Sequence, residues 1–181
     1  MRTFDGDLEM RILFGLFAFC MAIAYATQDA AAETCVKDAW YPGSYNLCVS
    51  SVLSPQGKNT YGPRHLSLQH EGKAAWCEGV KGNGIGQTIS FQFLEGAQRV
   101  SAFDLLNGYQ KSDKHFHTNG RIRSVALSSN KGPLGVFEVH DVKYTSIDFP
   151  EGRYKWLKLE VLSVYPGTKY QDVCITGLAP I

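Results

Sequence analysis

Residues 154–165 alternate apolar and polar side chains more cleanly than any other stretch of the chain. Leu157, Leu159 and Val161 would share one face of an extended segment, and Lys158 and Glu160 would share the other. Because successive side chains of a β-strand point to opposite faces, this period of two predicts a strand that buries one face.

Shorter runs of the same kind recur after residue 60, at residues 88–93, 100–106, 125–127, 137–139, 147–149 and 173–178. No stretch there has the i, i+3, i+4, i+7 spacing of a useful amphipathic helix. The composition of 18 Gly, 10 Phe and 9 Tyr also favours short strands joined by tight turns. Seven or eight strands, about 8–12 residues apart, are typical of an all-β sandwich or jelly roll. A chain of 181 residues has room for one such domain.

The N-terminal region, residues 1–26, has the features of a signal peptide. An uncharged apolar run at residues 12–26 follows Arg11, and Met10 could be the true start instead of Met1. Small-x-small patterns allow cleavage after Ala26 or after Ala32. The alternative is a retained membrane anchor, but the run is short for a span. We expect a secreted or periplasmic protein with no membrane insertion after cleavage.

Four cysteines remain after the predicted cleavage: Cys35, Cys48, Cys77 and Cys174. An even number in an oxidising compartment indicates two disulfides, and the sequence alone allows three pairings. We favour Cys35–Cys48 and Cys77–Cys174. Zinc is the competing interpretation, but no pair has the C-x-x-C spacing that zinc usually needs. Residues 27–60 are rich in turn signals, so we expect an irregular extension closed by a disulfide, followed by the domain at residues 61–181.

Neither the overall charge nor the local motifs predict catalysis or nucleic-acid binding. With a net charge of +1, the chain lacks the excess of positive charge that is typical of nucleic-acid-binding proteins. The glycines of residues 79–86 lead into a strand rather than a helix, so they indicate a tight loop with positive φ angles. His115 and His117 lie in a polar stretch expected to be an exposed loop, and no third metal ligand can be named. No nucleophile elbow or carboxylate pair is apparent, so we expect no enzyme activity and no metal.

Polar and aromatic residues gather at the ends of the predicted strands. Flat aromatic rings stack on sugars, while Asn, Asp, Arg and Lys side chains bond to hydroxyl groups. The expected ligand-binding residues are Glu78, Asn107, Tyr109, Asn119, Arg121, Tyr165, Lys169 and Asp172. The alternative is structural: Asn107 and Asn119 would form turns, and Arg121 and Asp172 would form a buried pair.

Five segments carry a family resemblance: residues 75–79, 82–87, 106–112, 119–123 and 164–175. In this order they resemble the NADase-type glycan-binding domain, also called the NAD glycohydrolase translocation domain, a discoidin-like, galactose-binding-like jelly roll. The resemblance extends from about Tyr61 to the C-terminus. It implies a carbohydrate-binding β-sandwich without NAD hydrolysis, because in the namesake toxin a separate domain carries that activity.

The sequence departs from the family pattern at two places. Cys77 stands where an apolar residue is more usual, which fits an added Cys77–Cys174 bridge. Thr176 and Gly177 replace a Ser-Glu pair, so no ligand role is carried over to that acidic position. Relatives of this fold often hold a structural calcium ion, for which no ligands can be named here. The expected partner is a glycan; the alternative is an envelope or extracellular protein bound without any sugar.

Overall fold

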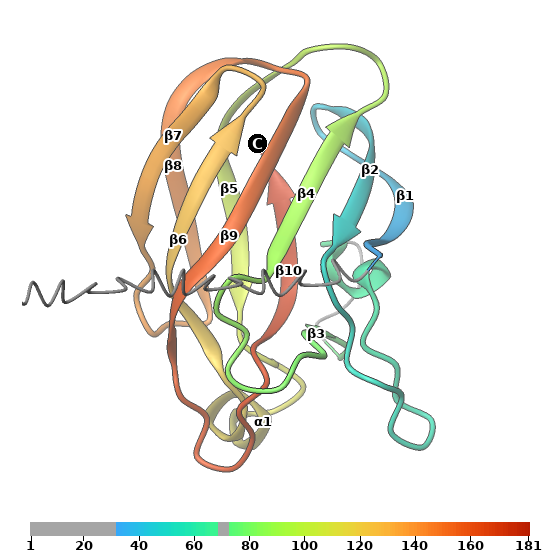
Figure 1. The fold of residues 1–181 in the computed structure, drawn as a ribbon, viewed down its shortest axis with the longest axis vertical. Helices are drawn as coiled ribbons and strands as arrows, with labels where there is room; N and C mark the ends of the chain where they lie inside the picture. The colour runs from blue at the N-terminus through green and yellow to red at the C-terminus, as the bar shows by residue number, and fades with distance from the viewer. Residues whose placement is uncertain (1–31, 69–72) are drawn as a thin grey trace, which may run out of the picture. The chain divides into compact units, whose positions relative to one another are not determined.

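The protein is described by a computed structural model covering residues 32–68 and 73–181. The predicted signal peptide lies outside these residues. Within them, two antiparallel sheets form a β-sandwich (Figure 1), which confirms the expected all-β class. The larger sheet has the order β1 (Thr34–Trp40), β2 (Gly43–Val49), β4 (Thr88–Phe93), β9 (Trp156–Tyr165), β6 (Arg121–Ser129) and β7 (Gly132–Glu138). The smaller sheet has the order β3 (Trp76–Cys77), β10 (Cys174–Pro180), β5 (Gln98–Asn107) and β8 (Tyr144–Tyr154).

The core lies between the two sheets and uses the alternation seen in the sequence. Leu157, Leu159 and Val161 of β9 are fully buried. The rings of Phe91 in β4 and Phe103 in β5, with centroids 5.2 Å apart, join the two layers. Each such side chain stabilises the fold by about 1.5–3 kcal/mol when it leaves water.

The N-terminal part of the domain differs from the sequence-based expectation. Residues expected to be irregular instead form the hairpin β1–β2, and β2 pairs with β4 as part of the larger sheet. Tyr45, Leu47 and Val49 of β2 are buried in the core, because the turn-rich sequence also alternates in polarity. This segment is therefore an integral edge of the sandwich.

Both favoured disulfides are confirmed. Cys35 and Cys48 face each other in the β1–β2 pair and are bonded. Cys77 of β3 and Cys174 of β10 also face each other, and their bond spans 97 residues of sequence. The second bridge ties the short strand β3 to the last strand of the domain.

Two connecting segments are also informative. Gly82, Gly84 and Gly86 have positive φ angles, as the tight-loop interpretation predicted. The expected loop around His115 and His117 is instead the short helix α1 (Asp113–Thr118), whose first turn is capped by the side chain of Ser112. The one other helical segment of the described residues is η1 (Pro63–Leu66). Neither helix has the length or the apolar character needed to span a membrane.

Candidate functional site

A cavity of about 150 Å³ opens where α1, the β9–β10 loop and residues 53–61 come together. These segments follow or precede strand ends on the α1 side of the sandwich (Figure 1). The cavity is lined by Leu53, Gln56, Asn59, Tyr61, Cys77, Tyr109, Lys111, His115, Asn119, Tyr170 and Asp172. It therefore combines three phenol rings with amide, ammonium, imidazole and carboxylate groups.

The three tyrosines give the cavity its aromatic surface. Tyr61 and Tyr109 are buried, whereas Tyr170 is 43% exposed. The Tyr109 ring meets the His115 ring edge to face, with centroids 5.1 Å apart. Burial raises the pKa of Tyr61, with smaller contributions from Tyr170 and the Asp172 carboxylate. Tyr61 and Tyr109 consequently keep their phenolic protons at neutral pH and can donate as well as accept hydrogen bonds.

The polar groups of the cavity come from residues 53–61, from α1 and the residues that flank it, and from the loop after β9. Asn119 ends α1 and donates from Nδ2 to the carbonyl oxygen of His115, at 2.8 Å. Asp172 has its pKa raised by burial. It is the single carboxylate among the described residues that line the cavity.

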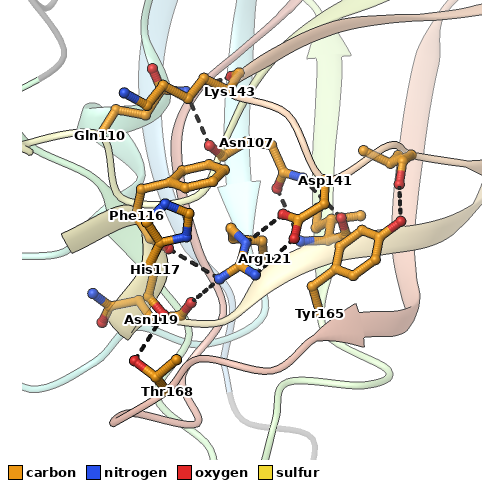
Figure 2. A network of polar contacts seen from close by, with 12 residues as sticks. Asn107, Gln110, Phe116, His117, Asn119, Arg121, Asp141, Lys143, Tyr165 and Thr168 are labelled. Carbon is orange, nitrogen blue, oxygen red and sulfur yellow. Dashed lines mark hydrogen bonds and ion pairs between the residues drawn. The ribbon is translucent and has the colours of Figure 1, made fainter. Parts of the chain in front are cut away.

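A buried guanidinium holds this wall in place (Figure 2). Arg121 donates from Nη1 to the carbonyl oxygens of Phe116, at 3.1 Å, and Asn119, at 2.9 Å. Its Nε and Nη2 atoms bond to the two carboxylate oxygens of Asp141, at 2.6 and 3.0 Å. The donors of Arg121 thus bind the backbone at the end of α1 and the carboxylate of Asp141, so they hold the protein together rather than pointing into the cavity. The alternative buried pair with Asp172 is wrong, because the partner is Asp141 from the β7–β8 loop.

Two other expected ligand residues also belong to the frame. Asn107 is fully buried and exchanges two hydrogen bonds with the backbone of Ile122, at 2.8 and 2.9 Å, which joins the end of β5 to β6. Tyr165 donates its hydroxyl to the carbonyl oxygen of Val139, at 3.1 Å (Figure 2). The side chains of Asn107 and Tyr165 therefore stabilise the fold by bonding to the backbone.

Glu78 is fully buried beneath the glycine loop. Its Oε2 accepts from the backbone N–H of Val80, at 2.8 Å, while Oε1 has no hydrogen-bond partner among the described residues. Burial raises the pKa of this carboxyl, and the nearby Asp172 raises it further. A Cβ on Gly84 would lie 2.7 Å from the Glu78 Cγ, so glycine at that position makes room for the buried acid.

The eight expected ligand residues thus separate into two groups. Tyr109, Asn119 and Asp172 lie on the cavity wall, and Lys169 lies in an adjoining cleft. Glu78, Asn107, Arg121 and Tyr165 do not line the cavity. The sequence analysis did not select six further residues of the cavity wall: Gln56, Asn59, Tyr61, Lys111, His115 and Tyr170. Lys111 and Tyr170 lie within residues 106–112 and 164–175, which carry the family resemblance.

Metal ligands are not apparent in the described part of the chain. The one group of suitable side chains there is Glu33 with Cys35 and Cys48. These two cysteines are bonded to each other, so their sulfurs are not thiolate ligands. No residue of the structure is assigned to calcium.

Residues 40–179 match the family described as the NAD glycohydrolase translocation F5/8 type C domain. The chain belongs to this family. The match to the F5/8 type C domain begins at Trp40, the last residue of β1, rather than near Tyr61. It therefore includes β2, in agreement with the position of this strand inside the sheet.

Solved structures share the discoidin-like fold of this F5/8 type C domain. Arabinofuranosyltransferase AftD from Mycobacteria has a TM-score of 0.57 at 12% identity, over 81% of this chain and 11% of that one. The family 32 carbohydrate-binding module of Streptococcus pneumoniae EndoD has a TM-score of 0.53 at 11% identity, over 75% and 94% of the two chains. Chitosan-binding module 1 of a Paenibacillus sp. IK-5 chitosanase/glucanase has a TM-score of 0.51 at 13% identity, over 75% and 92%. The chain thus corresponds to about a tenth of the transferase and to nearly the whole of each module. None of the curated proteins matches the chain.

Proposed function

We propose that this protein is a non-catalytic carbohydrate-binding domain that holds one sugar residue in the cavity beside α1. The observation that carries the proposal is the lining of this cavity, in which three phenol rings surround amide and carboxylate groups. Two of the structural neighbours named above are themselves carbohydrate-binding or chitosan-binding modules, which supports the same ligand class.

The chemistry of the lining suits a pyranose. Aromatic faces accept the C–H groups of one side of a sugar ring, and Tyr170 is the exposed aromatic residue of the cavity lining. Asp172 accepts from hydroxyl groups, whereas the phenols of Tyr61 and Tyr109 both donate and accept. At about 150 Å³ the cavity is smaller than the roughly 300 Å³ at which drug-sized sites begin, so it fits one residue of a glycan.

The same lining supports binding without hydrolysis. Glycoside hydrolysis by the usual routes uses two carboxyl groups that flank the bond to be broken. Among the described residues of the cavity, Asp172 is the single carboxylate. The groups present can hold a sugar, and they do not provide an acid together with a nucleophile or base.

Export of the protein is part of the proposal. Two disulfides within one domain are typical of proteins that mature outside the cytoplasm. We therefore assign the protein to the secreted or periplasmic class, with cleavage after Ala26 or Ala32 and the folded domain after it.

Binding of the purified, oxidised protein to a broad glycan array tests this function. We expect selective binding, and a Tyr170→Ala variant should bind at least about tenfold more weakly, which corresponds to ~1.4 kcal/mol. The matched control is Tyr144→Ala, because Tyr144 is also exposed but does not line the cavity. A blank array from folded protein would refute carbohydrate binding and favour an envelope protein as the partner.

A further inference from the structure

A second cleft, of about 210 Å³, adjoins the sugar cavity. It is lined by Lys114, His115, Thr118, Lys169 and Tyr170. His115 and Tyr170 line both spaces, so the two are neighbours that share a wall. A glycan residue seated in the cavity would therefore extend its next residue over the cleft.

The cleft is lined by two lysines and by no acidic residue among the described residues. Lys114 and Lys169 come from α1 and the β9–β10 loop, and Lys111 adds a third ammonium group from the cavity wall. Within the described residues none of these three lysines takes part in an ion pair. The acid nearest in sequence to Lys111 and Lys114, Asp113, is already paired with Lys143. Asp172, three residues after Lys169, lines the cavity and not the cleft. Because the whole chain carries only +1, these lysines are a local excess of positive charge.

The Lys169 ammonium lies 5.0 Å from the centroid of the Tyr170 ring. This cation–π contact keeps the ammonium near the wall that the cavity and the cleft share. The charge is therefore placed beside the position expected for the sugar, instead of extending away into solvent.

The two sides of the cleft are joined by the backbone. The N–H groups of Lys169 and Tyr170 both donate to the carbonyl oxygen of Thr118, at 3.2 and 2.9 Å. Thr168 donates in the same way to the carbonyl oxygen of His117, at 3.0 Å. The β9–β10 loop is thus fastened to α1, and the backbone from which Lys114 and Lys169 extend is positioned before any ligand arrives.

From these observations we infer that the natural ligand is an acidic glycan. One sugar residue occupies the cavity, and a carboxylate or sulfate group on the adjacent residue lies between Lys114 and Lys169. This inference rests on the proposed function and specifies its ligand class. Hydrogen bonds between charged partners are roughly twice as strong as neutral ones, and the positive field also speeds the encounter with an anionic chain. A neutral glycan would use the cavity alone.

The test is an array that holds the same oligosaccharide backbones in neutral, carboxylated and sulfated forms, followed by titration of the best binder in each form. We expect the acidic forms to bind at least tenfold more tightly than their neutral counterparts, with a preference that shrinks as salt rises from low ionic strength to 0.5 M, about three times the physiological value. The carboxylated and sulfated arms show which anion the cleft takes.

Two double variants with equal loss of charge complete the test. Lys114→Gln/Lys169→Gln should abolish the preference for acidic forms and leave binding of the neutral forms nearly unchanged. Lys131→Gln/Lys155→Gln changes exposed lysines at the β6–β7 and β8–β9 turns, and should retain the preference. Equal binding of acidic and neutral forms by the wild-type protein would overturn the acidic ligand while leaving carbohydrate binding intact. Binding to no form would refute the proposed function itself.

Discussion

Arg121 and Asp141 form a two-pronged ion pair, Nε to Oδ1 at 2.6 Å and Nη2 to Oδ2 at 3.0 Å, which joins the start of β6 to the β7–β8 loop. The Arg121 side chain is 7% exposed, and its guanidinium also donates to the carbonyl oxygens of Phe116 and Asn119. The Phe116 ring also stacks on it, 5.0 Å from centroid to Cζ. The sequence pointed to Arg121 as a ligand residue. In the structure it positions α1, and His115 of this helix and the flanking Asn119 line the cavity.

Replacing this guanidinium should therefore destabilise the fold. In Arg121→Lys an ammonium group cannot reach two backbone carbonyls and both oxygens of Asp141, so buried acceptors lose their partner. We expect a loss of about 2–4 kcal/mol in the free energy of unfolding, measured by urea denaturation. Arg123→Lys is the control, since Arg123 is exposed; it should change stability by less than about 0.5 kcal/mol. Equal effects of the two substitutions would contradict the positioning role.

Gly167 lets the β9–β10 loop approach α1. A Cβ at this position would overlap the carbonyl oxygens of Tyr170 and Thr118, and neither backbone group can move without breaking the loop attachment. Gly167→Ala should displace Lys169 and Tyr170, lower glycan affinity at least about tenfold and cost about 1–3 kcal/mol of stability. Gly62→Ala has no atom within 4 Å of the new Cβ and should leave both quantities unchanged. Unaltered binding by Gly167→Ala, from titration of the array ligand, would show that the loop attachment does not shape the site.

The two disulfides should contribute unequally to stability. Cys77–Cys174 closes 97 residues and Cys35–Cys48 only 13, and a longer loop removes more entropy from the unfolded chain. We expect a cost of about 4–5 kcal/mol for Cys77→Ala/Cys174→Ala and about 3 kcal/mol for Cys35→Ala/Cys48→Ala, from denaturation without reductant. The reverse order would mean that packing around the hairpin, rather than loop closure, governs the difference.

The buried Glu78 carboxyl should make stability depend on pH. Its pKa is raised in the folded state, mainly by burial, so the native protein binds this proton more tightly than the unfolded chain does. Between the unfolded and the folded pKa, stability falls as pH rises, because the unfolded chain releases a proton that the native state keeps. The Asp172 carboxyl, whose pKa is also raised, acts in the same direction.

Glu78→Gln isolates this contribution. Glutamine keeps an oxygen that can accept from the N–H of Val80, and it carries no charge. The variant should therefore be more stable than the wild type at neutral pH, and its free energy of unfolding should decrease less as pH rises above 4.5. Denaturation curves from pH 4 to 8 measure both effects. Glu138→Gln, at an exposed position in β7, is the control and should follow the wild-type profile. A Glu78→Gln profile parallel to the wild type would contradict a raised pKa of Glu78 in the folded protein.

Local patterns were sufficient for the strands β4 to β10 and for the class of fold. The run expected at residues 88–93 coincides with β4, and the alternation of Leu157, Leu159 and Val161 predicted their burial, because a period of two is a property of neighbouring residues. The hairpin β1–β2 escaped prediction since Pro42 and Gly43 dominate its turn and disguise the strands beside it. The helix α1 has fewer than two turns, too short for a periodic signal.

The candidate site depended on contacts that no local pattern encodes. The sequence by itself determined a disulfide-bonded β-sandwich with polar and aromatic residues at its strand ends, and it predicted export of the protein. Only the tertiary structure decided that Tyr61, Tyr109 and Tyr170 share one cavity, that Arg121 pairs with Asp141, and that Asn107 is committed to the backbone. The reason is physical: a side chain's burial and partners are set by segments distant in sequence, and an Arg or Asn at a strand end suits a ligand and a buried frame equally well.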